Sequence, residues 1–399
     1  MSAPMSRFSK PSSLVILVLL ALLVLTGLPL VSSAPNRLLS GHGLSLWTIS
    51  ESTGALWKES LMALSLVFVV ALVGLCHRSW QRFFSALVLV ALASGWWYLT
   101  AMSGQFAAVA NTQTDGLGRI ALSSGYWLTV LIAWLAANDA LRRVRATTWA
   151  RYLYWLSVLA GLLGLLACGT LDSLSLLKEF ANRQDDFWRA LGQHIHIIAL
   201  VTFFTLVIGL PLGVAIHRHP AWASRVFPLL SIVQTIPSIA LFGLLIAVLA
   251  WLGKLFPLLP AWGLQGIGLA PAVMALTLYS LLPLTRSTSE GLSQLPQALT
   301  ESGKAMGLSN SQLFWQVELP LAFPVILSGL KVMLIQTIGL TAVAALIGAG
   351  GLGSLMFEGL FSSALDLVVL AVIPIVVLTW LANGIFFLLT AISRQWIRG

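Results

Sequence analysis

The feature that most constrains this chain is a series of apolar runs, each long enough to cross a membrane as a helix. A transmembrane helix needs about 20 predominantly apolar residues, and lipid offers no hydrogen-bond partner to a free backbone group. An outer-membrane barrel would instead show segments of about 10 residues with alternating polarity. The sequence therefore predicts an all-α polytopic membrane protein with about ten transmembrane helices. The expected spans are residues 13–34, 60–76, 83–103, 118–137, 152–171, 190–216, 226–252, 267–285, 322–347 and 365–393.

Composition agrees with a membrane protein and excludes several other classes. Apolar residues make up 58% of the 399 residues and charged residues 9%, against about 25% charged residues in soluble domains. This balance excludes a disordered chain and an ordinary soluble enzyme. The net charge of +9 does not indicate nucleic-acid binding, because the charges lie in short gaps between apolar runs. The two cysteines, Cys76 and Cys168, predict neither a disulfide framework nor a metal site.

The distribution of Lys and Arg sets the expected orientation, since cytoplasmic loops carry an excess of both. With the N-terminus inside, the inner segments hold fourteen Lys and Arg residues and the outer segments seven, so both termini are expected in the cytoplasm. The first run leaves two interpretations open: a retained anchor, or a signal peptide cleaved after the small residues Ser32–Ala34, which would leave nine spans. The run from Leu14 to Val31 is longer than a usual signal core, which favours the anchor.

A change of composition near residue 185 divides the chain into two expected regions. Residues 1–185 form an accessory transmembrane region of about five spans, with tryptophans of the kind that suit membrane interfaces. Residues 186–399 hold about five further spans that are interrupted by Pro, Gly and polar residues. Such interruptions are tolerated in lipid where the backbone is buried in protein or lines a cavity. The second region is therefore expected to carry the function.

The longest cytoplasmic segment, residues 286–320, predicts a pair of short helices. Pro296 suits the start of a helix, and Gly307 suits a helix C-terminus. Ser309, with Gln312 three residues later, forms a capping-box pattern for a second helix, which Pro320 is expected to end before the next span. A plain connector would not need internal caps, so this segment is expected to have a role of its own.

The same segment carries a specific resemblance to a known element. It reads Glu301-Ser302-Gly303, three residues, Gly307, nine residues and Val317-Glu318-Leu319-Pro320. This resembles the EAA loop of ABC importer permeases: Glu-Ala-Ala, three residues, Gly, nine residues, Ile, any residue, Leu-Pro. The departures from that pattern remain small or apolar. The resemblance implies that this loop docks into a cleft of a cytoplasmic ATPase subunit, with a coupling role for Glu301, Ser302, Gly303, Gly307, Leu319 and Pro320.

The resemblance covers the whole second half. Gln234–Leu241 and Gly348–Gly353 are similar to segments of the osmoprotectant subgroup, which imports glycine betaine, choline, carnitine or proline betaine and includes long forms with extra N-terminal spans. Permeases for methionine share parts of these segments. An ion-coupled secondary transporter is the alternative from another class, with Lys331 as its one candidate ion site within a span. A non-transporting membrane sensor is a further alternative.

The resemblance also implies partners in the bacterial inner membrane. These are a second permease, identical or paralogous, a cytoplasmic ABC ATPase dimer that binds ATP and Mg, and a periplasmic substrate-binding protein. The lipid bilayer is the surrounding medium, and no nucleic acid is involved. The chain itself would bind no cofactor or metal and catalyse no covalent reaction.

Two interruptions of the apolar pattern are candidates for the transport pathway. Gln234, Thr235, Pro237 and Ser238 are expected to line it, because Pro237 removes a backbone N–H bond from its helix and exposes a neutral polar surface. Gly348, Gly350, Gly351 and Gly353 are expected to break a helix beside the outer gate. Their G-x-G-x-x-G pattern follows an apolar span rather than a strand, which excludes a dinucleotide site. The pairs His194/His196 and His217/His219 are expected to be interfacial residues rather than metal ligands.

Overall fold

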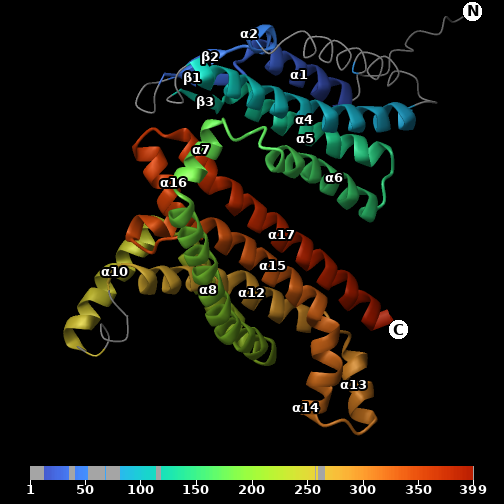
Figure 1. Ribbon diagram of the computed structural model, residues 1–399. Coiled ribbons are helices and arrows are strands. Elements are labelled where there is room, and N and C mark those ends of the chain that lie inside the picture. The colour runs from blue at the N-terminus through green and yellow to red at the C-terminus, as the bar shows by residue number, and fades with distance from the viewer. Residues whose placement is uncertain are drawn as a thin grey trace, which may run out of the picture. The chain divides into compact units, whose positions relative to one another are not determined.

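The computed structural model describes residues 13–35, 41–52, 68, 81–113, 118–256, 258 and 266–398 (Figure 1). The chain forms two compact units, Met1–Asn182 and Arg183–Gly399. Within the described residues, seven helical stretches are long and apolar enough to cross a membrane. They are Gln81–Gln113, Thr148–Ala167, Gln184–Arg218, Ser238–Leu255, Leu269–Ser293, Asn310–Ile347 and Leu365–Ser393.

The expected spans differ from the observed helices at three places. A fourth, the span expected at 60–76, lies outside the described residues except for residue 68. The run 13–34 gives a helix of 15 residues followed by a strand, and the run 118–137 also begins with a strand. The run 226–252 is divided into two helices at Pro237, because a residue before proline is disfavoured in the helical region. The expected number of about ten spans is therefore not confirmed helix by helix, whereas the helical membrane fold is confirmed.

Unit 1 is helical apart from a small sheet that the apolar pattern did not predict. Strand β1 lies between β2 and β3 and pairs antiparallel with both. The register places Val31 opposite Leu44 on one side and Leu122 on the other. The elements of this unit are α1 (Ser13–Gly27), β1 (Val31–Ala34), β2 (His42–Leu44), α2 (Leu46–Ser52), α4 (Gln81–Gln113), β3 (Arg119–Leu122), α5 (Ser124–Arg143), α6 (Thr148–Ala167) and α7 (Ser175–Asn182).

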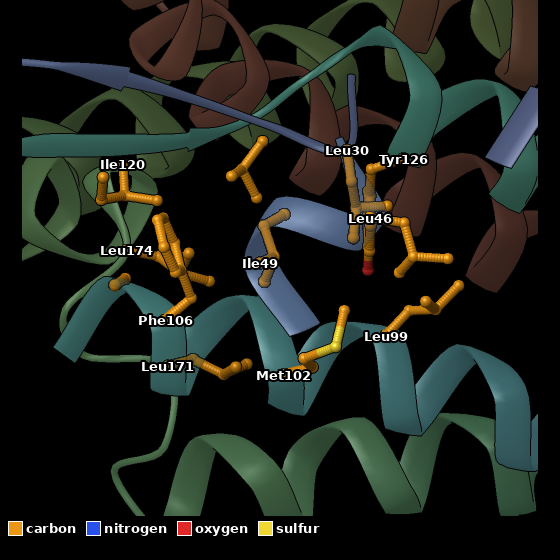
Figure 2. Close-up of a cluster of buried hydrophobic side chains, with 12 residues drawn as sticks. Leu30, Leu46, Ile49, Leu99, Met102, Phe106, Ile120, Tyr126, Leu171 and Leu174 are labelled. Atoms are coloured by element: carbon orange, nitrogen blue, oxygen red, sulfur yellow. The ribbon is translucent and has the colours of Figure 1, made fainter. Parts of the chain in front are cut away.

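The core of unit 1 gathers apolar side chains from the sheet, α2, α4 and the start of α5, as Figure 2 shows. Tyr126 brings a hydroxyl into this core, and two neighbours satisfy it: Trp96 Nε1 donates to it at 2.9 Å, and Thr100 Oγ1 lies 2.8 Å away. Helix α6 approaches α4 closely because Gly161 leaves room for the Trp97 ring. Since buried polar groups without partners are costly in lipid, these contacts fix the helices in one arrangement.

The first apolar run is an integral part of unit 1. Leu14 and Val18 of α1 are buried against α4 and α5, and Leu30 and Val31 are fully buried in the sheet core. The Arg143 side chain also donates to Ser13 Oγ at 2.9 Å. Cleavage after Ala34 would remove the central strand of the sheet, so these contacts favour the retained anchor.

We predict that the mature protein keeps residues 13–34, because their loss would expose the core that α1 and β1 now cover. The intact mass of the protein purified from membranes measures this directly. A mature N-terminus at Pro35, in protein that is folded and active, would contradict the prediction.

Unit 2 is built on three long helices, α8, α12 and α15, that pack side by side, with α17 along α15 (Figure 1). Shorter elements join them at both ends. The elements of this unit are α8 (Gln184–Arg218), η1 (Pro220–Trp222), α9 (Ala223–Thr235), α10 (Ser238–Leu255), α12 (Leu269–Ser293), α13 (Gln297–Ala305), α14 (Asn310–Leu313), η2 (Phe314–Glu318), α15 (Leu319–Ala344), η3 (Ala345–Ile347), α16 (Leu352–Phe361) and α17 (Leu365–Arg398).

Small residues allow the three long helices to approach closely. Gly209 and Gly213, one turn apart on α8, face α12: a Cβ atom on Gly213 would lie 2.5 Å from Thr288 Cβ and 2.8 Å from the Thr285 carbonyl oxygen. A Cβ atom on Gly329 of α15 would likewise collide with the Ser287 side chain of α12. Close backbone approach at small residues is a principal source of helix association in membranes. The glycines of this unit therefore set the spacing of its core.

Candidate coupling hairpin and pathway breaks

The helix pair predicted within residues 286–320 is present in unit 2. Helix α13 follows Pro296, and α14 follows Ser309, whose hydroxyl and Gln312 form the reciprocal capping box. Gly307 joins the two helices with φ of +85°, a left-handed conformation that favours glycine. We call residues 297–313 the coupling hairpin. Figure 1 shows it beyond the ends of α12 and α15.

The predicted coupling residues in the hairpin divide into an exposed and a buried set. Glu301 and Ser302 are exposed on α13, where Gln297 Nε2 donates to Glu301 Oε1 at 2.9 Å. Gly303 is buried instead, and a Cβ atom there would lie 2.6 Å from Leu313 Cδ1 on α14. The small residue at 303 thus serves the close approach of the hairpin's own two helices, while 301 and 302 remain accessible to another protein.

The ends of this segment correct two expectations. Helix α12 continues to Ser293, so Arg286 lies within a helix, 3.4 Å from Glu290 one turn later. Pro320 does not end the second helix, because a π-helical turn over Phe314–Glu318 leads into α15 without a gap. The Leu319 N–H bonds to the Phe314 carbonyl, five residues back. Pro320 stands at the second position of α15, directly after this π-helical turn, so it lies within a continuous helical path.

The first predicted pathway segment is a complete helix break at Ile236 and Pro237, both extended. We call it the proline break. Gln234 is half-buried, and its side chain donates to the Tyr279 carbonyl at 2.8 Å. The Tyr279 hydroxyl in turn donates to the Ile236 carbonyl. Thr235 is exposed and bonds only within its own helix, and Ser238 begins α10. Tyr279 of α12 is thus hydrogen-bonded both to Gln234, before the break, and to Ile236, within it, a role that the sequence did not identify.

The second predicted pathway segment lies between α15 and α16. Gly348, Gly350 and Gly351 all have positive φ angles, and we call residues 348–351 the glycine break. The Gly268 N–H bonds to the Ile347 carbonyl at 3.0 Å just before it. Gly353 lies inside α16, where a Cβ atom would come within 1.9 Å of the Ala342 carbonyl oxygen. That glycine serves helix packing, whereas the other three serve the turn.

The structure brings both breaks to one buried apolar cluster of α8, α10, α12 and α15. Val233 and Ile236 beside the proline break, and Ile347 and Ala349 beside the glycine break, all pack against it. The cluster around the breaks is neutral, because none of the residues that form it or pack against it carries a charge. No group of His, Cys, Asp and Glu in the described part of the chain could hold a metal ion. The arrangement offers hydroxyl, amide and backbone groups but no reactive or metal-binding centre.

Two residues of α8 at the glycine break were not predicted as site residues. The Gly351 N–H donates to Gln193 Oε1 at 3.1 Å. His194 is fully buried in the protein, and its Nε2 lies 3.2 Å from the Ile338 carbonyl oxygen. His196, two residues on, is exposed.

Two family models match the chain, one on each half. Residues 9–177 match the model described as "ABC transporter permease YehY, N-terminal domain". Residues 205–399 match "Binding-protein-dependent transport system inner membrane component".

Several bacterial permeases are similar to the second half. The osmoprotectant import permease protein OsmW of Salmonella typhimurium is 40% identical over 206 residues, which are 50% of this chain and 89% of that protein. The glycine betaine/carnitine/choline transport system permease protein OpuCD of Bacillus subtilis is 33% identical over 202 residues, covering 48% and 81%. A structure of the MetNI methionine ABC transporter in an inward-facing conformation aligns with a TM-score of 0.47 and 23% identity over 53% of this chain and 98% of that one.

Proposed function

The chain belongs to the binding-protein-dependent transport system inner membrane components, multi-pass permeases of bacterial ABC importers rather than enzymes, and we propose that it imports osmoprotectants of the glycine betaine and choline type. The observation that carries the substrate class is the 40% identity to an osmoprotectant import permease over nearly all of that protein's length. The neutral surface at both breaks supports it, because a quaternary ammonium ion has no N–H donors and needs no carboxylate along its path.

The partners follow from the family and complete the proposed mechanism. A periplasmic binding protein delivers the substrate to the outer loops, and a second permease, identical or paralogous, provides the other half of the channel. Two cytoplasmic ATPase subunits bind ATP and Mg and engage the coupling hairpin. In this proposal both chain termini lie in the cytoplasm, since the hairpin must face the ATPase and the Lys and Arg bias agrees.

Uptake of labelled glycine betaine, choline and methionine by cells with and without this chain tests the proposed substrate class. We expect chain-dependent uptake of a quaternary amine and none of methionine. Uptake of methionine alone would support the methionine alternative. Uptake that survives inactivation of the ATPase and follows an ion gradient would support a secondary transporter, whose ion site would have to be Lys331, a half-buried residue on α15.

We propose that Gln234, Thr235, Pro237 and Ser238 line the pathway, with the glycine break and Gly353 beside its outer gate. Cysteines at 234, 235 and 238, in a background without Cys76 and Cys168, are expected to react with a small water-soluble thiol reagent. The rate should differ between resting and ATP-trapped states because the cavity changes sides, with Thr235→Cys the most reactive since Thr235 is exposed. Ser280→Cys, which replaces a side chain only 1% exposed, is the matched control. No labelling at any of the three positions in an active transporter would place the pathway elsewhere.

We further propose that residues 1–185 are an accessory module and that residues 186–399 form the permease core. The three long helices, the coupling hairpin and both breaks all lie after residue 182. A chain that begins near Asp185, with an outward-leading signal, is therefore expected to insert and to co-purify with the ATPase. A correctly inserted core that never assembles with the ATPase would show that the first region is needed for the complex.

A further inference from the structure

The outer part of the permease core contains a contact that the transport model does not use: α8 fastens the short helix α16 at both of its ends. At one end, Arg183, the residue that caps α8, approaches the last turn of α16, where its Nη1 lies 2.6 Å from Glu358 Oε1. At the other, Gln193 Oε1 accepts the N–H of Gly351, the residue that caps α16, at 3.1 Å. Helix α16 has only 10 residues and is too short to span a membrane on its own. Its position therefore depends on the helices that hold it.

The glycine break is shaped around the same two side chains of α8. A Cβ atom on Gly350 would lie 2.4 Å from Gln193 Oε1, and one on Gly351 would lie 3.2 Å from His194 Nδ1. Nδ1 of the buried His194 has no hydrogen-bond partner among the described residues, while Nε2 faces the Ile338 carbonyl on α15. The imidazole thus lies between α15 and the turn, and a side chain on Gly351 would press against it, whereas a side chain on Gly350 would press against Gln193.

The backbone N–H groups of the glycine break bond back toward α15 as far as Ala349. The Gly348 and Ala349 N–H groups bond back to Ala345 and Ala344. Gly351 is different, because its N–H bonds to a side chain of another helix. A helix N-terminus leaves several N–H groups without helical partners, and here Gln193 supplies one of the acceptors. The start of α16 is therefore joined to α8 by a side-chain hydrogen bond, while Gly353 packs it against Ala342 of α15.

We propose that Gln193 and His194 are positioning residues that lock the glycine break to α8, so that α16 shifts with α8 when the transporter changes state. Gln193 accepts the N–H of Gly351, the last residue of the turn, and His194 keeps α15 and the turn apart at a fixed spacing. Without this lock the break moves independently, and ATP hydrolysis proceeds without a matching closure of the outer gate. The inference rests on the proposed function, since it assumes that the break lies beside that gate.

Hydrogen–deuterium exchange on the full transporter complex in detergent tests the lock without any substrate. Gln193→Leu removes the acceptor at nearly constant volume, and we expect peptides over residues 348–355 to exchange at least about tenfold faster than in the wild type. Gln193→Glu retains an oxygen acceptor and should restore wild-type exchange. His196→Leu, an exposed change on the same helix, is the matched control. Equal exchange of residues 348–355 in Gln193→Leu and the wild type would overturn the proposal.

A second measurement separates positioning from a general loss of folding. In vesicles with the binding protein and betaine, Gln193→Leu and His194→Leu are expected to hydrolyse ATP at near wild-type rates while uptake per ATP falls several-fold. Equal losses of ATP hydrolysis and uptake would assign these residues to general stability and overturn the positioning role. A wild-type complex that transports none of the tested substrates would count against the proposed function, whereas the exchange result would still stand.

Discussion

Gly307→Pro is expected to abolish uptake while the protein remains inserted in the membrane. Gly307 has φ of +85°, which proline cannot adopt, and its N–H bonds to the Lys304 carbonyl at 2.9 Å, which proline cannot donate. The turn between α13 and α14 must therefore open, and the buried contact between Gly303 and Leu313 is lost with it. Because the hairpin is the proposed ATPase contact, both co-purification of the ATPase and betaine uptake should fall by more than about tenfold. For the ATPase, a tenfold loss of affinity corresponds to about 1.4 kcal/mol of binding free energy.

Gly307→Asn is the matched control, since asparagine tolerates the left-handed conformation and keeps the N–H group. Glu301→Lys tests the same contact through charge, because Glu301 is exposed on α13 and its reversal leaves the hairpin fold intact. Glu290→Lys makes the same charge change on α12, outside the hairpin, and should retain uptake. If Gly307→Pro and Glu301→Lys both keep the ATPase bound and transport substrate, the coupling role of the hairpin is wrong.

Gly213→Ala is expected to destabilise the permease core by roughly 1–3 kcal/mol, the usual cost of inserting a methyl group into a packed interface. The new Cβ atom would lie 2.5 Å from Thr288 Cβ and 2.8 Å from the Thr285 carbonyl oxygen, which belongs to the backbone of α12 and cannot turn aside. Helices α8 and α12 must separate to accommodate it. The midpoint of thermal unfolding of the purified protein in detergent should fall, and the yield of folded protein should fall with it.

Gly192→Ala on the same helix is the matched control, because a Cβ atom there would meet nothing within 4 Å. Alanine favours a helix over glycine by up to about 1 kcal/mol, so this variant should be neutral or slightly more stable. The same substitution is thus expected to lower the stability at Gly213 and not at Gly192. A Gly213→Ala protein as stable as the wild type would show that the interface relaxes around the added methyl group.

Local patterns in the sequence determined the helical membrane fold and the form of the coupling hairpin. The apolar runs predict helices because lipid leaves no other partner for backbone groups, and Pro296, Gly307 and the Ser309 cap act on bonds within a few residues of themselves. Their effects do not depend on distant parts of the chain, so the start of each hairpin helix and the turn between them were predicted correctly, whereas the expected end of the second helix at Pro320 was wrong. The family resemblance rested on the same local segment.

Contacts between distant residues decided the rest, and no local pattern reveals them. Tyr279 is hydrogen-bonded to Ile236 of the proline break, 43 residues away in the sequence, and Gln193 to Gly351, 158 residues away. The strand β1 formed within an apolar run because β2 and β3 offered it pairing partners on both sides. Gly353, grouped by sequence with the glycine break, instead packs on Ala342. Hydropathy and spacing describe what a residue is near in the chain, whereas burial and hydrogen bonding depend on which helices the fold brings together.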